Sequence, residues 1–98
     1  MKKYTINEKQ YELIEEYKDG FDLNEVQNKL TEFYDNYDYI VGDWAYGKLR
    51  LKGFYNHDNK LVKKYNDYDL VEDYINNNCA YGCKHFILEQ INDKTIEK

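Results

Sequence analysis

Two alternating segments on either side of a short loop constrain the fold of this chain most. Residues 39–44 and 49–55 are rich in β-branched and aromatic residues, and they flank Ala45-Tyr46-Gly47-Lys48. This pattern is typical of a β-hairpin. A two-residue and a four-residue loop give the same register. That register pairs Val41 with Lys52, Gly42 with Leu51, Asp43 with Arg50 and Trp44 with Leu49.

The two faces of this hairpin differ in polarity. Successive side chains of a strand point to opposite faces. One face holds Ile40, Trp44, Leu49 and Leu51, which we expect in the core. The other holds Val41, Asp43, Arg50 and Lys52, which we expect in contact with solvent, with Asp43 and Arg50 forming a cross-strand ion pair.

Two amphipathic segments predict helices. Asp22 with Glu25, and Asp69 with Glu72, have the spacing of capping boxes, in which side chains accept unpaired backbone N–H groups. Apolar residues follow each box at helical spacing. We expect the first helix to extend to about residues 34–36 and the second to be short.

The remaining regular segments predict three further strands. Residues 4–6 and 11–17 read as a hairpin, and residues 85–88 are apolar on both faces apart from His85, which is typical of a buried central strand. The order is therefore β-β-α-β-β-α-β. The fold class is α+β, with a mainly antiparallel sheet and two helices on one face.

The length and charge of the chain limit its organisation and its partners. Its 98 residues suffice for one domain, 1–98, in which we expect residues 1–3 and 92–98 to fray. Nineteen acidic against 14 basic residues give a net charge of −5, which disfavours non-specific nucleic-acid binding. Without an apolar stretch for a leader or a membrane span, we expect a cytoplasmic protein.

Enzymatic chemistry is disfavoured. The chain has no serine, and its paired carboxylates have the pattern of solvated faces and caps. Residues 42–48 share glycine and lysine spacing with a phosphate-binding loop, but Leu49 stands where that motif needs Ser or Thr, and a strand follows where it needs a helix. We therefore expect no cofactor and no catalytic residues.

The two cysteines, Cys79 and Cys83, leave two interpretations open. Free cysteine is among the most buried residue types, which favours two structural thiols. The alternative is a redox pair or disulfide. A metal site is disfavoured, because the spacing is unusual for zinc and only His57 and His85 remain as further nitrogen ligands.

Three segments resemble the YutD-like family of Gram-positive bacteria. They are Tyr39-Ile40-Val41-Gly42-Asp43-Trp44, then Leu49-Arg50-Leu51-Lys52-Gly53-Phe54, and then Cys79 and Gly82-Cys83 with Phe86. The resemblance spans roughly residues 11–91 and departs at Ala45, Asn78 and Lys84-His85. It implies a small cytoplasmic α+β protein and supplies neither a function nor catalytic residues.

The hairpin surface is the candidate binding site. Its candidate residues are Asp43, Tyr46, Lys48, Arg50, Lys52, Phe54 and Tyr55. Because tyrosine is enriched at protein interfaces, we expect a non-catalytic protein-binding or regulatory module, with an acidic, tyrosine-rich surface suited to a basic partner protein. The alternative is RNA binding by the Lys48, Arg50 and Lys52 stripe with neighbouring aromatic rings.

Overall fold

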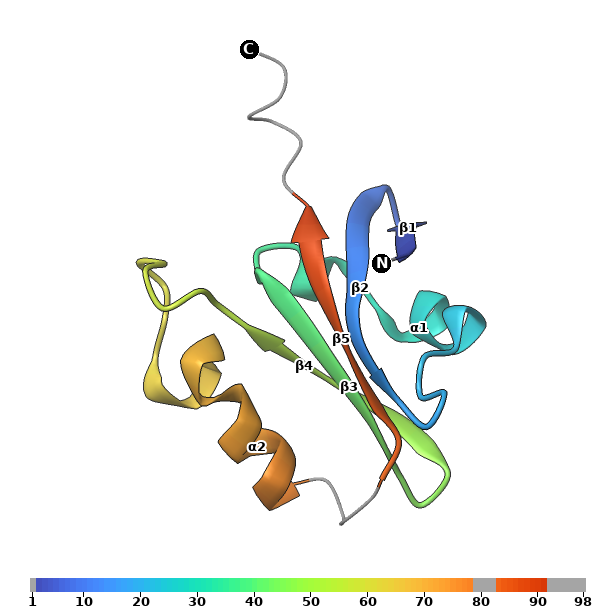
Figure 1. Ribbon diagram of the computed structural model, residues 1–98. Helices are drawn as coiled ribbons and strands as arrows, with labels where there is room; N and C mark the ends of the chain where they lie inside the picture. The colour runs from blue at the N-terminus through green and yellow to red at the C-terminus, as the bar shows by residue number, and fades with distance from the viewer. Residues whose placement is uncertain (1, 79–82, 92–98) are drawn as a thin grey trace.

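The computed structural model describes residues 2–78 and 83–91, and its elements follow the expected order (Figure 1). Three short 3-10 helices, named η, accompany the strands and α-helices. The elements are β1 (Lys2–Ile6), β2 (Lys9–Tyr17), α1 (Leu23–Lys29), η1 (Glu32–Tyr34), β3 (Tyr39–Ala45), β4 (Lys48–Phe54), η2 (Lys64–Asn66), η3 (Tyr68–Leu70), α2 (Val71–Asn78) and β5 (His85–Ile91). The α+β class is confirmed.

The five strands form one antiparallel sheet in the order β1-β2-β5-β3-β4. β5 lies in the middle, and its Phe86, Ile87 and Leu88 are buried. The apolar run that predicted a central strand is therefore confirmed. The β3–β4 register is also confirmed, since Asp43 pairs with Arg50 and the neighbouring pairs follow as predicted.

The two helices lie on opposite faces of the sheet, not on one face as we expected. Ile40 and Val41 are successive residues of β3 and so point to opposite faces. Ile40 packs in one core cluster with Val26 of α1, whereas Val41 packs in a second cluster with Val71 of α2. The sheet is therefore a middle layer between the helices.

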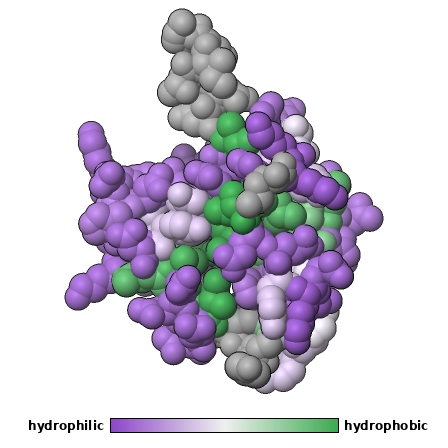
Figure 2. Space-filling view, viewed as in Figure 1, coloured by the Kyte–Doolittle hydropathy of each residue, from purple (hydrophilic) through white to green (hydrophobic). Residues whose placement is uncertain are grey.

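The layer of α2 also overturns the prediction of a solvated hairpin face. Val41 and Asp43 are buried, and Lys52 is only partly exposed. In Figure 2 hydrophobic side chains form a band across the middle of this face, with hydrophilic side chains around it. Val71 and Ile75 of α2 and Ile87 of β5 line a pocket between the helix and the sheet.

Close packing on the other face depends on a glycine. A Cβ added to Gly42 would lie only 2.1 Å from the ring of Phe86. Because Phe86 is fully buried, its ring has no free space into which it could move. The absence of a side chain at Gly42 therefore leaves room for the ring of Phe86 on the α1 side of the sheet.

The end of α1 and the start of α2 differ from the sequence prediction. Asp22 caps α1 as expected, with its carboxylate accepting from Glu25 N at 3.2 Å. The α-helix ends at Lys29, because Thr31 starts η1 by accepting a hydrogen bond from Phe33 N. Ahead of α2 the capping residue is Asp67, not Asp69, since Asp67 accepts from Asp69 N at the start of η3.

The chain ends also differ in part from expectation. Lys2 and Lys3, which we expected to fray, form the start of β1 and pair with Leu13 and Glu12. Residues 92–98 lie outside the described part of the chain. Among the described residues, no helix combines the length and the apolar character needed to cross a membrane.

Candidate protein-binding surface

A strained two-residue turn connects β3 and β4. Ala45 pairs with Lys48, and the two residues between them, Tyr46 and Gly47, have positive φ angles of 55° and 75°. This is the type I′ geometry that matches the twist of a hairpin and that favours Asn, Asp or Gly. A tyrosine at the first position costs roughly 1 kcal/mol relative to those residues.

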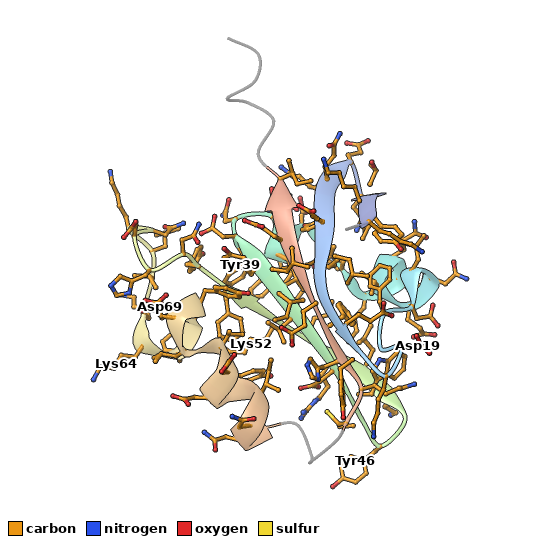
Figure 3. All side chains as sticks on the ribbon, in the orientation of Figure 1. Asp19, Tyr39, Tyr46, Lys52, Lys64 and Asp69 are labelled. Carbon is orange, nitrogen blue, oxygen red and sulfur yellow. The ribbon has the colours of Figure 1, made fainter. Side chains whose placement is uncertain are left out.

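The side chain of Tyr46 is not buried by the fold in return for this strain. It is fully exposed, and Figure 3 shows it projecting from the turn away from the sheet. The turn therefore presents a large aromatic ring at the tip of a hairpin that is anchored between other elements.

An ion pair below the turn fixes the hairpin. Arg50 donates from Nε to Asp43 Oδ1 at 2.8 Å and from Nη2 to Asp43 Oδ2 at 3.1 Å. Asp43 is only 2% exposed, whereas Arg50 is 47% exposed. The hydrogen bond from Arg50 and the negative charge of Asp43 raise the pKa of the guanidinium, with smaller contributions from Tyr74 and Tyr46. The hydroxyl of Tyr46 thus lies within electrostatic reach of Arg50.

Lys52, two residues further along β4, belongs to a different environment. Its ammonium lies 5.2 Å from the ring centroid of Phe54, 5.5 Å from that of Tyr65 and 5.6 Å from that of Tyr74. Burial lowers the pKa of Lys52. These contacts are cation–π interactions beneath α2 and η2, so Lys52 is not part of an open basic stripe.

The aromatic candidates on β4 are also covered. Phe54 is 1% exposed and packs edge-on against Tyr74 of α2, and Tyr55 is 9% exposed and pairs with Asp67. A base can stack only on an exposed ring face. Of the seven candidates, the structure therefore brings Tyr46, Lys48 and Arg50 to the surface together, and we call these three the hairpin-tip surface.

Trp44 supports this tip from the α1 side. Its indole N–H donates to the carbonyl of Gly20 at 2.7 Å, and the ammonium of Lys84 lies 4.6 Å from its ring centroid. The predicted core role of Trp44 fits its partial burial against the α1-side cluster. The sequence analysis missed Lys84, which is adjacent to Trp44 only because β5 pairs with β3.

A histidine cluster lies on the α2 face next to the ion pair. His85 is the cross-strand neighbour of both Asp43 and Tyr17. Its Nε2 is 3.1 Å from Glu15 Oε2, and its ring stacks on Tyr17 at 5.3 Å between centroids. These contacts connect β2 to the strands that carry the hairpin tip.

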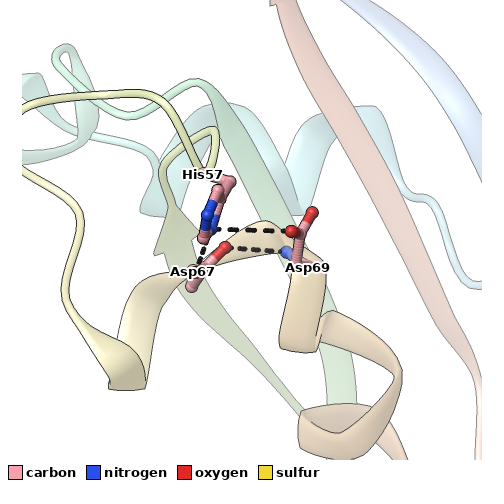
Figure 4. A group of neighbouring side chains, drawn as sticks. All are labelled: His57, Asp67 and Asp69. Carbon is pink, nitrogen blue, oxygen red and sulfur yellow. Dashed lines mark hydrogen bonds and ion pairs between the residues drawn. The ribbon is translucent and has the colours of Figure 1, made fainter.

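A second polar cluster lies in the segment before α2 (Figure 4). His57 Nδ1 is 2.8 Å from Asp67 Oδ2 and 3.5 Å from Asp69 Oδ2. One ligand atom from each residue lies within 4.8 Å of the others, close enough to hold a divalent cation. Asp67 raises the pKa of His57, and His57 lowers that of Asp67. Because ion pairing and capping already account for the arrangement, we assign it a structural role.

The expectation of two structural thiols is wrong for Cys83, and the disulfide alternative is favoured. Cys79 lies outside the described residues, whereas Cys83 is half-buried immediately before β5 and is disulfide-bonded. The described part of the chain therefore contains no free thiol, and a redox role of the pair stays a prediction.

The geometry defines a class of protein before any comparison is made. It is a small α+β domain whose antiparallel sheet has a helix packed on each face. The model of the family described as "Putative antitoxin YutD-like" matches residues 5–89, so the chain belongs to the YutD-like family.

A relative from Bacillus subtilis and a solved structure of yutD from the same species support this assignment. "Putative antitoxin YutD" of Bacillus subtilis (strain 168) is 37% identical over 86 residues, which cover 88% of this chain and 94% of the relative. The solution NMR structure of yutD from B. subtilis has a TM-score of 0.78 at 35% identity, with coverage of 94% of this chain and 84% of that one. The resemblance identified from the sequence is confirmed.

Proposed function

We propose that this protein is a non-catalytic module that binds a partner protein through the hairpin-tip surface. The observation that carries the proposal is Tyr46, a fully exposed tyrosine held in a strained turn. Strained residues cluster at functional sites, and rigid tyrosines are common energetic centres of interfaces. Lys48 and Arg50 add charge beside the ring.

The partner class follows from the relatives. The B. subtilis relative carries the name of an antitoxin. For this chain we propose that the partner is a toxin protein and that binding covers its active surface. Protein recognition is favoured over RNA recognition, because Phe54 and Tyr55 are buried and Lys52 is held by aromatic rings.

The experiment uses a photo-crosslinking amino acid at position 48 in the full chain, expressed in its own host. The crosslinked partner is identified by mass spectrometry and then purified, and its affinity is measured for wild type, Tyr46→Asn and Lys48→Glu. Asn suits positive φ, so Tyr46→Asn removes the ring without disturbing the turn. We expect each variant to weaken binding at least about tenfold, as for an interface hot spot.

Phe33→Asn is the matched control, because Phe33 is 69% exposed but lies in η1, outside the hairpin. Equal affinity of wild type and Tyr46→Asn for the partner would refute the proposed surface. Recovery of crosslinked RNA in place of protein would favour the RNA-binding alternative.

A further inference from the structure

The outer edge of β2 is only half covered. β1 pairs with β2 from Lys9 to Leu13, whereas β2 pairs with β5 as far as Tyr17. Among the described residues, the outer edge of residues 14–17 has no strand beside it. Figure 1 shows β1 alongside one end of β2 only. An uncovered edge presents backbone N–H and C=O groups to a further strand.

A pocket of about 540 Å³ lies at this edge. Lys2 and Tyr4 of β1 line it together with Asp19 and Phe21, and the ring centroids of Tyr4 and Phe21 lie 4.7 Å apart. The loop containing Asp19 leaves the line of the sheet, because Lys18 and Asp19 have φ angles of 58° and 57°. The space therefore continues the line of β1. Four residues of strand span about 13 Å, so a segment of four to five residues matches the open edge.

The side chains around this edge specify the charge of the occupant. Glu15, Glu16 and Asp19 line the pocket against a single lysine, Lys2. Glu15 pairs with Ile87 and Glu16 with Phe86, so these two carboxylates lie on opposite faces of the sheet. An added strand therefore meets a carboxylate on each of its faces. The apolar lining of Tyr4, Leu13, Ile14 and Phe21 suits β-branched side chains between the charges.

The geometry points to a strand-addition site at residues 14–17 of β2, where an extended basic segment of a partner protein pairs with the backbone. Main-chain hydrogen bonds supply affinity in this mode, and side-chain pockets supply specificity. The net charge of −5 steers a basic segment toward the chain. The acidic side chains also oppose pairing between two copies of the same edge. This inference does not depend on the hairpin-tip surface.

The test titrates the full chain with three capped peptides and follows backbone amide NMR shifts. The first peptide is Thr-Val-Lys-Lys-Val-Thr, the second replaces both lysines with glutamate, and the third is the basic peptide N-methylated at every backbone amide. We expect the basic peptide to shift amides of residues 13–21 and of β1, and we expect the acidic and the N-methylated peptides to leave them unchanged.

A charge-neutralised variant separates strand addition from general attraction. Glu15→Gln/Glu16→Gln/Asp19→Asn keeps side-chain shape, and we expect it to weaken binding of the basic peptide about tenfold, because charge pairs at an interface contribute to affinity. The control, Glu8→Gln/Glu32→Gln/Asp58→Asn, changes the net charge equally at exposed sites outside the pocket. We expect the control to bind as wild type does.

Three outcomes would overturn the inference. Equal binding of the N-methylated peptide would mean that the backbone edge is not used. Shifts confined to other strands, or no shift with the basic peptide, would show that the edge of β2 does not bind this peptide. Concentration-dependent shifts of residues 14–17 without peptide would assign the edge to a second copy of this chain. Because the hairpin tip is unaltered in these variants, failure here leaves the proposal for that surface intact.

Discussion

Arg50 donates two hydrogen bonds to Asp43 across the β3–β4 hairpin, and Asp43 is almost completely buried. Arg50→Met removes the cation that compensates a buried carboxylate, so we expect a loss of about 3 kcal/mol in the free energy of unfolding. Asp43→Asn keeps the shape of the side chain and should cost less. Denaturant unfolding of both single variants and of the double variant measures the coupling. If the two losses simply add, the pair is not coupled.

Replacing Tyr46 with a residue that suits its backbone conformation should stabilise the protein. Tyr46→Asn removes no buried contact and fits positive φ, so we expect a gain of about 0.5–1 kcal/mol in the free energy of unfolding. Tyr46→Val, β-branched in the same turn, should lose stability. Equal melting temperatures for the two variants would contradict the strain assigned to this turn.

The His57–Asp67 pair predicts a pH window for part of the stability. The raised pKa of His57 stabilises the fold at low pH, and this contribution is lost as pH rises through the folded pKa. The lowered pKa of Asp67 stabilises the fold at higher pH, and this contribution is lost as pH falls through its folded pKa. The benefit of the pair is therefore largest between about pH 4 and 6.5, the ordinary pKa values of the two side chains.

Melting temperatures of wild type and His57→Gln should differ within this window and converge as pH rises above the folded pKa of His57. Asp67→Asn keeps an oxygen that can cap η3 but removes the charge, so it should return the imidazole pKa, measured by NMR, toward its ordinary value. An unchanged imidazole titration in Asp67→Asn would show that the ion pair does not form in solution.

The raised pKa of Tyr68 predicts how the α2 layer responds to alkaline pH. Burial raises the pKa of Tyr68 to about 12, and its ring stacks on Tyr39 at 3.6 Å between centroids. The neutral phenol is favoured in the fold, so this stabilisation is complete below about pH 10 and is lost as pH rises toward the folded value.

Tyr68→Phe keeps the stack and removes the ionisable hydroxyl. We expect its alkaline unfolding, followed by circular dichroism, to occur at higher pH than that of wild type. Tyr46→Phe, which removes an exposed hydroxyl, is the control. Coincident transitions for wild type and Tyr68→Phe would remove Tyr68 from the alkaline response.

The sequence predicted local features of the fold better than contacts between distant segments. The register of β3 and β4 and the central place of β5 followed from the alternation around Asp43 and from the apolar run at Phe86. The burial of the face covered by α2 did not follow from the sequence. The residues of this face, Val41, Asp43, Arg50 and Lys52, are together as polar as those of an exposed face. Its burial depends on a helix that starts 17 residues after the end of β4.

The candidate site shows the same division. Tyr46 and the Asp43–Arg50 pair were found because the turn and the register are local. The aromatic contacts of Lys52 depend on Tyr65 and Tyr74, and the contact of Trp44 with Lys84 depends on a third strand. No short motif connects such residues, so only the assembled sheet brings them together.

The two core clusters are unequal, and this has a consequence for the order in which the layers open. Among the described residues, the α1-side cluster holds nine buried residues, whereas the α2-side cluster holds four. The free energy needed to open a layer increases with the apolar area that it buries. Amide hydrogens of α2 should therefore exchange with solvent before those of β5 and β2, and the buried carboxylate of Asp43 should meet water while the α1 side is still folded. The sheet would then stay folded while the α2 layer opens and water briefly reaches the base of the β3–β4 hairpin.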